Sequence, residues 1–197
     1  PNNRIQLDLS SVRNRAVTDV FEPGSTVKPF TVAVALDSGL DMGFTIDTSP
    51  GFLRVDDAVI KDPHNRGVLD LGGILAYSSQ VGISRLALSL NEYDIWKQFQ
   101  TLGFGEVTGV GFPGESSGFL PNRRRWKDIE RVTFAYGYGL TVTPLQLASA
   151  YSTIASGGIK REVSLIAGQV SEGQRVMNAG IALQLQNMLG RVITEGT

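Results

Sequence analysis

Residues 21–30 of this chain read FEPGSTVKPF and are its most informative segment. A Pro-Gly turn is followed by apolar residues at helical spacing, which predicts a helix that begins near Ser25 and ends before Gly39. Backbone N–H groups at a helix start lack intrahelical partners, and the helix dipole favours negative charge there. Lys28 lies three residues after Ser25, and residues at this spacing share a helix face. The Lys28 amine can therefore approach the Ser25 hydroxyl and activate it as a nucleophile without a histidine.

The pattern S-x-x-K also has an ordinary interpretation. A serine after Pro-Gly is a common helix N-cap, and a lysine one turn later is usually solvated. Two fixed positions in four recur by chance roughly once in a chain of this size. The pattern therefore indicates catalysis only where further motifs accompany it.

A second segment, residues 71–82, reads LGGILAYSSQVG. Asp70 predicts the N-cap of a short helix whose apolar face Ser78 continues, and another helix begins near Ile83. This arrangement places Ser78 and Gln80 at a junction between two helices, where side chains can project into a cleft. The set S-x-x-K, S-x-N and K-[ST]-G is typical of penicillin-binding proteins and class A β-lactamases. Gln80 stands where that set has asparagine; it keeps the amide and adds a methylene.

These motifs and the segments 13–17, 20–30 and 134–140 closely resemble the transpeptidase domain of class B penicillin-binding proteins. The resemblance is to the cell-division (septal) branch of Gram-negative bacteria. It implies an α+β fold of the penicillin-binding protein and β-lactamase type, with a helical region and part of an antiparallel sheet. Residues 1–197 would form a partial transpeptidase domain truncated at both ends. No K-[ST]-G occurs in the chain, which would stop before the family's third motif. The remainder of the sheet would come from residues outside it.

The resemblance further implies a serine D,D-transpeptidase that cross-links peptidoglycan stem peptides during septal cell-wall synthesis. Ser25 would attack the penultimate D-alanine carbonyl, with Lys28 as the acylation base. Ser78 would relay a proton to the leaving amine, and Gln80 would hold a substrate amide. The Ser25 N–H would supply half of an oxyanion hole. β-Lactams would acylate the same serine, whereas the fragment alone would be inactive without its third motif.

Two more residues are candidates for substrate binding. Tyr138 would form a wall of the cleft, or would pack in the core. Glu22 would orient the loop before the nucleophile and contact substrate, or would only cap that loop.

Two other classes of function share parts of this pattern. A serine β-lactamase would use Ser25 and Lys28 but needs a residue that delivers water for deacylation, and no local sequence identifies one. A diverged division scaffold or a β-lactam sensor would need no turnover, and Gln80 favours this class. Turnover distinguishes them, because a lactamase releases hydrolysed penicillin and a transpeptidase stays acylated.

Composition narrows the function less than the motifs do. With 197 residues, 42% of them hydrophobic, the chain is long enough to bury a core. A net charge of −1 offers no electrostatic case for nucleic acid. The absence of cysteine excludes disulfides, thiolate nucleophiles and cysteine metal sites, and we predict neither metal nor cofactor.

Localisation and partners follow from the resemblance alone. No apolar run approaches the ~18 residues of a membrane span. The resemblance implies a membrane anchor upstream of the chain and a catalytic domain at the periplasmic face of the bacterial inner membrane. The implied partners are peptidoglycan stem peptides, β-lactam antibiotics, a septal glycosyltransferase and divisome membrane proteins.

Three tempting features are interpreted as structural. Residues 109–114 satisfy G-x-G-x-x-G, but the following residues predict a loop rather than the helix of a dinucleotide site. The basic run 123–127 has acidic neighbours and indicates a solvated face or a partner contact. His64 has no second histidine and lies in a polar turn.

The rest of the chain predicts further elements of one domain. They are short β-like pieces over 40–60, a helix over 93–102, a glycine-rich loop over 103–121, a helix capped by Thr143 that begins at Pro144 and is ended by Gly157, a strand over 163–170 and a helix over 178–190.

Overall fold

The computed structural model describes residues 13–41, 43–169 and 171–196. Helices dominate, the strands are short, and the α+β class expected from the sequence is confirmed. The elements are α1 (Arg15–Thr18), the 3-10 helix η3 (Gly24–Val27), α2 (Lys28–Asp37), β1 (Thr45–Asp47), β2 (Phe52–Val55), β3 (Ala58–Lys61), β4 (Val68–Asp70), α3 (Leu71–Ala76), α4 (Gln80–Ser89), α5 (Glu92–Thr101), α6 (Asp128–Ala135), α7 (Pro144–Ala155), β5 (Ile159–Lys160), β6 (Gln174–Arg175) and α8 (Ala179–Glu195).

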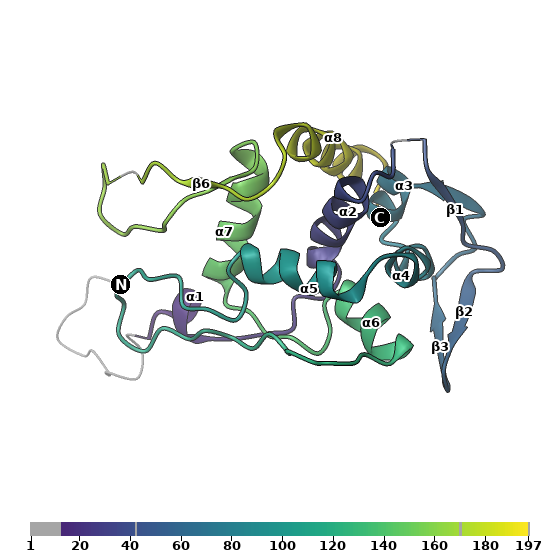
Figure 1. Ribbon diagram of the computed structural model, residues 1–197, viewed down its shortest axis with the longest axis horizontal. Coiled ribbons are helices and arrows are strands. Elements are labelled where there is room, and N and C mark those ends of the chain that lie inside the picture. Colours follow the sequence, from purple (N-terminus) through teal and green to yellow (C-terminus); the bar gives the residue numbers. More distant parts are fainter. Residues whose placement is uncertain (1–12, 42, 170, 197) are drawn as a thin grey trace.

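Helix α2 is the centre of the molecule, with the strands β1 to β3 towards one end and α7 on the other side (Figure 1). Every residue from Lys28 to Leu36 is buried. The Phe30 ring makes edge-to-face contacts with Phe99 of α5, at 6.5 Å between centroids, and with Tyr151 of α7, at 5.3 Å. A helix that is apolar on all sides is a core helix. Its burial fixes where the Lys28 side chain can lie.

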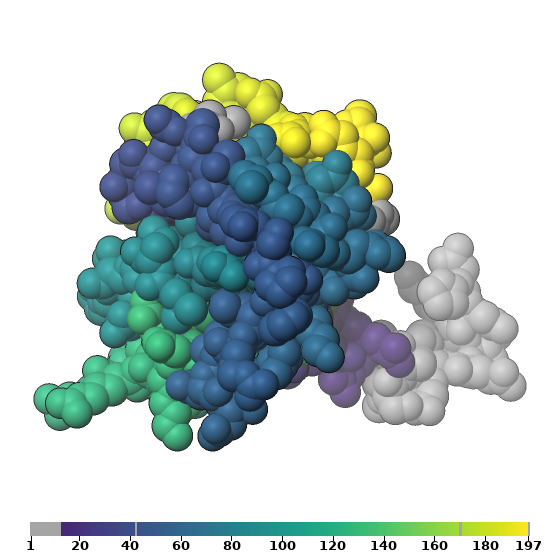
Figure 2. Space-filling view, turned by 90° about the vertical axis from the view of Figure 1, so that its right-hand side faces the viewer, coloured from purple at the N-terminus to yellow at the C-terminus, as the bar shows by residue number. Residues whose placement is uncertain are grey.

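The strands form three separate antiparallel pairs, β1 with β4, β2 with β3, and β5 with β6. The short β-like pieces expected over 40–60 are thus confirmed. A two-residue turn joins β2 to β3, and its first residue, Asp56, has a φ of +49°, which an aspartate tolerates. The Asp56 carboxylate accepts a hydrogen bond from the Ile129 N–H at 3.0 Å, in the first turn of α6. Figure 2 shows the blue hairpin beside the green segment that leads into α6.

The strand predicted over 163–170 is wrong for 163–169, and Val170 lies outside the described residues. The pairing in this region is instead between β5 and β6, which flank the segment. Leu165 and Ile166 are 61% and 64% exposed, so their apolar character reflects no buried face. The short helices α1 and α6 were not predicted. The helices over 93–102 and from Pro144 are confirmed, as is the loop over 103–121.

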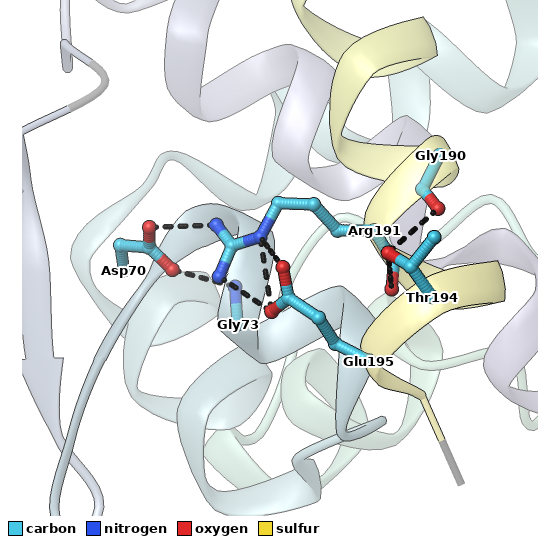
Figure 3. A network of polar contacts seen from close by, with 6 residues as sticks. All are labelled: Asp70, Gly73, Gly190, Arg191, Thr194 and Glu195. Carbon is cyan, nitrogen blue, oxygen red and sulfur yellow. Dashed lines mark hydrogen bonds and ion pairs between the residues drawn. The ribbon is translucent and has the colours of Figure 1, made fainter.

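Helix α8 extends beyond the predicted end at Gly190. Polar contacts of Arg191 join it to the start of α3 (Figure 3). Arg191 Nη1 donates to Asp70 Oδ2 at 2.8 Å, and Glu195 accepts from Arg191 Nε and Nη2. The other Asp70 oxygen caps α3 by accepting from Gly73 N. A Cβ at Gly72 would overlap Arg191 Nη1 and would lie 3.1 Å from Cζ. The glycine thus allows the guanidinium to lie directly on α3.

Candidate active site

Ser25 lies in η3, and Lys28 begins α2 directly after it. The Lys28 N–H donates to the Ser25 carbonyl oxygen, so the two residues belong to one continuous turn. Ser25 is exposed, whereas Lys28 is only 1% exposed. The predicted helix start is therefore confirmed, with an exposed serine one turn before a buried lysine.

Two distant segments hold the turn that carries Ser25. Gly24 N donates to Gly137 O at 3.0 Å, on the side before the serine. A Cβ at Gly137 would overlap the Gly24 carbonyl oxygen and would lie 2.6 Å from the Gly24 nitrogen. On the side after the serine, the Tyr151 hydroxyl donates to Thr26 O at 2.8 Å. The main chain on both sides of Ser25 is thus fixed by contacts across the fold.

The Lys28 amine reaches Ser78, fifty residues along the chain. Its Nζ donates to the Ser78 carbonyl oxygen at 2.6 Å and to Ser78 Oγ at 3.1 Å. Burial lowers the pKa of Lys28 to about 8, and the nearby charge of Asp62 opposes that shift. Within the described residues the Ser25 hydroxyl has no hydrogen-bond partner. The Lys28 amine is therefore hydrogen-bonded to Ser78 and not to Ser25.

Ser78 lies in the loop between α3 and α4, so the expected junction of two helices is confirmed. The more detailed expectation, that Ser78 continues the face of the first helix, is wrong. Helix α3 ends at Ala76, and Ser78 has a φ of +51°. The left-handed region is uncommon for residues other than glycine and is found in turns and at functional sites. Here it turns the chain so that both the hydroxyl and the carbonyl of Ser78 reach Lys28.

The remaining candidates, Gln80, Tyr138 and Glu22, are all at least partly exposed. Gln80 is the first residue of α4 and is partly exposed. Tyr138 is 47% exposed, which excludes the alternative of core packing, and its ring lies 5.7 Å from that of Tyr136, edge to face. Glu22 is exposed, and its Oε1 accepts from Gly139 N at 2.9 Å. Glu22 thus links the segment before Ser25 to the segment that carries Tyr138.

Asp62 is a residue of this region that the sequence analysis missed. It follows β3, and its carboxylate accepts hydrogen bonds from Ser79 and Gln80, which come directly after Ser78. Local sequence gave no signal for this role, because the partners lie 17 and 18 residues away. His64, in the same turn, is exposed, in agreement with its structural interpretation.

The other tempting motifs do not join the site. Residues 109–114 form a loop without a following helix. Arg123 to Arg125 are exposed, and Arg123 pairs with Glu130. In the part of the chain that the structure describes, no three His, Asp or Glu side chains gather as a metal site. No helix within those same ranges is sufficiently long and apolar to span a bilayer.

A cavity of about 790 Å³ lies elsewhere, between the end of α5, α7 and the β5–β6 hairpin. Its lining carries both signs of charge, since it includes Lys97, Lys160, Glu106 and Glu172. Lys160 Nζ is bound to the Thr101 carbonyl at 3.0 Å. None of the six candidate residues lines this cavity, which is separate from the serine–lysine centre.

The geometry describes a helix-rich α+β domain in which an exposed serine precedes a buried lysine. The family model for the penicillin binding protein transpeptidase domain matches residues 1–197. The chain belongs to this family.

Its relatives include peptidoglycan D,D-transpeptidase FtsI of Escherichia coli strain K12, which is 42% identical over 198 residues, covering 100% of the chain and 33% of that protein. The probable peptidoglycan D,D-transpeptidase PbpC of Pseudomonas aeruginosa is 36% identical, covering 99% of the chain and 35% of that protein. The chain thus spans about a third of the length of these relatives.

Solved structures confirm the expected fold. The transpeptidase domain of Burkholderia pseudomallei penicillin-binding protein 3, in its apo form, matches with a TM-score of 0.87 and 38% identity, covering 92% of the chain and 56% of that structure. A peptidoglycan glycosyltransferase from Burkholderia ambifaria matches with a TM-score of 0.87 and 36% identity, covering 94% of the chain and 60% of that structure.

Proposed function

We propose that this chain carries the nucleophile of a peptidoglycan D,D-transpeptidase, with Ser25 as the attacking group. The observation that carries the proposal is the buried Lys28 amine, which is bonded to Ser78 and lies one turn from the exposed Ser25. A serine hydroxyl needs a neighbouring base, and a lysine can serve only if it is neutral part of the time. Relatives named as peptidoglycan D,D-transpeptidases support the same reaction.

The mechanism begins with the removal of the Ser25 proton. Because burial lowers the pKa of Lys28 to about 8, a useful fraction of this amine is neutral near pH 7. Ser25 Oγ attacks the penultimate D-alanine carbonyl of a stem peptide, and the bond to the terminal D-alanine breaks. Ser78, hydrogen-bonded to Lys28, passes a proton to the leaving amine. An amine of a neighbouring stem peptide then attacks the acyl-enzyme carbonyl and forms the cross-linking amide. The ester bond to Ser25 Oγ breaks, and the proton lost by the amine returns to Ser25.

The surrounding residues would bind the substrate and stabilise its charge. The Ser25 N–H supplies one donor to the developing oxyanion. Gln80 holds a substrate amide from the start of α4. Tyr138 forms a wall of the cleft, and Glu22 orients the loop before Ser25 through its hydrogen bond from Gly139 N.

The biological setting is part of the same proposal and rests on the resemblance to the septal branch. We place the complete protein at the periplasmic face of the inner membrane, held by an N-terminal anchor outside this chain. Its partners there would be a septal glycosyltransferase and divisome membrane proteins. β-Lactams would acylate Ser25 in place of the stem peptide.

Intact mass after incubation with a penicillin tests the proposal, with the complete protein and its Ser25→Ala variant. We expect a persistent adduct on the wild type and none on the variant. Release of hydrolysed penicillin would instead identify a lactamase. A folded wild type without adduct would identify a diverged scaffold, and acylation of Ser25→Ala would refute the nucleophile assignment.

Gln80→Asn separates the binding role of the amide from the chemistry. Asparagine retains the amide donor and acceptor one methylene closer to the backbone. We expect this variant to change the acylation rate much less than Ser25→Ala, which should abolish it. A loss of acylation as complete as that of Ser25→Ala would contradict the binding role assigned to Gln80.

A further inference from the structure

Asp62 is bound at the start of α4 by three hydrogen bonds. One carboxylate oxygen, Oδ2, accepts from Ser79 Oγ at 2.5 Å. The other, Oδ1, accepts from Gln80 N at 2.6 Å and from Val81 N at 3.1 Å. The two N–H groups belong to the first turn of α4, where no intrahelical acceptor exists and a negative charge is favoured. Asp62 therefore supplements Ser79, the N-cap, whose hydroxyl accepts from Gly82 N.

The residues that Asp62 binds are those that follow Ser78. The left-handed conformation of Ser78 places its carbonyl and hydroxyl against Lys28 Nζ. That conformation is held from one side by the end of α3, since Ser78 N donates to Leu75 O at 3.1 Å. From the other side it is held by the start of α4, which Asp62 fixes to the end of β3.

We propose that Asp62 is a positioning residue of the acyl-transfer site, holding the Ser78–Ser79 turn against the Lys28 amine through α4. The inference rests on the proposed function and adds a residue to it. Asp62 acts through Ser78 and Lys28 and does not touch the reacting atoms. Its carboxylate also makes it energetically harder for Lys28 to lose its proton.

The charge of Asp62 can be separated from its hydrogen bonds. Lys61 and His64, its neighbours in the turn, are exposed, and Arg66 lies over the Tyr77 ring at 4.3 Å. The charge of Asp62 raises the pKa of Lys28 against the larger effect of burial. Removal of this charge must therefore lower the pKa of Lys28 and move the rise of acylation with pH to lower pH.

The test compares Asp62→Asn and Asp62→Ala in the complete protein. Asparagine keeps an oxygen that can accept from the α4 backbone but loses the charge, whereas alanine loses both. The acylation rate with a fluorescent penicillin is measured from about pH 6 to pH 10, a range that brackets the titration of Lys28. The Lys28 titration is followed in parallel by NMR, which needs no acylation.

Two control variants separate the effect of the Asp62 charge from the effect of its hydrogen bonds. Ser79→Ala removes one hydrogen bond to Asp62 and keeps the charge, so the pH midpoint should not move. Asp56→Asn alters a carboxylate that caps α6 through Ile129 at the other end of the same hairpin. This variant should lower thermal stability without moving the Lys28 midpoint.

We expect Asp62→Asn to lower both midpoints, and Asp62→Ala to reduce the plateau acylation rate by about tenfold or more, because a small displacement of Ser78 misaligns the site. An unchanged midpoint by NMR, with acylation reduced only as far as in Asp56→Asn, would overturn the proposal. If the wild type itself is never acylated, the proposed function fails. The NMR midpoints then still decide whether Asp62 acts on Lys28.

Discussion

Replacing Gly137 by alanine would test how strictly the segment after α6 supports the turn that carries Ser25. Gly137 has a φ of +94°, a region that glycine adopts freely and alanine does not. An added Cβ would overlap the Gly24 oxygen and would lie 2.6 Å from the Gly24 nitrogen. Both are main-chain atoms, so the conflict can be relieved only by moving the backbone next to Ser25.

The expected loss of stability has three sources. The left-handed conformation costs alanine about 1–2 kcal/mol. Overpacking against a fixed backbone adds about 1–3 kcal/mol. Movement of the backbone also weakens the hydrogen bond from Gly24 N to Gly137 O, which is worth about 1 kcal/mol. We expect about 4 kcal/mol in total, which lowers the thermal midpoint of a domain of this size by about 8–16 °C.

Gly139→Ala is the matched control. Gly139 also has a positive φ, of +75°, but an added Cβ would meet nothing within 4 Å. The Gly139→Ala variant should therefore lose only the stability that the left-handed conformation costs alanine, about 1–2 kcal/mol. Thermal unfolding of both variants of the complete protein, with the penicillin acylation rate, measures the difference. Equal midpoints for the two variants, or normal acylation in Gly137→Ala, would refute the close contact with the Ser25 turn.

Three further predictions concern other parts of the structure. Tyr151→Phe removes the hydroxyl that donates to Thr26 and should lower the free energy of urea unfolding by about 1 kcal/mol; an unchanged value would contradict the bond. Gly72→Ala should displace the Arg191 guanidinium, so that Arg191→Ala costs less stability in this background than in the wild type. Equal costs in a double-mutant cycle would contradict the contact between Arg191 and α3. Because the pKa of Lys28 is lowered from 10.5 to about 8, the unfolded chain binds more protons between these pH values, and stability should rise with pH there. Lys28→Met should abolish this component of the rise, and an unaltered slope would count against the buried amine.

The sequence was most informative where few residues separate the partners. The Ser25–Lys28 spacing predicted a shared turn, and it forms because helical hydrogen bonds join residues three or four apart. Asp70 and Thr143 were recognised as N-caps for the same reason, since a capping side chain and the backbone N–H that donates to it lie within one turn. The strand predicted over 163–170 is absent from 163–169, because apolar character alone does not show whether a neighbouring segment covers it.

The contacts that complete the site join distant parts of the chain. Lys28 meets Ser78 at a separation of 50 residues, and Tyr151 meets Thr26 at a separation of 125. Ser78 was expected on a helix face, yet its left-handed conformation is what turns it towards the amine. Asp62 could not be recognised, because an aspartate before a proline looks the same whether or not a helix start lies beside it.

The amino-acid sequence by itself determined the family motifs, most of the helices and the serine–lysine turn, because these depend on hydrogen bonds and side-chain periodicity within a few residues. Only the tertiary structure decided that the Lys28 amine is buried against Ser78, that Asp62 fixes the adjoining helix and that Gly137 contacts the turn that carries Ser25. Burial and long-range polar contacts arise from the packing of the whole chain around α2. The pKa of Lys28 follows from that packing, since desolvation by surrounding residues is its largest cause.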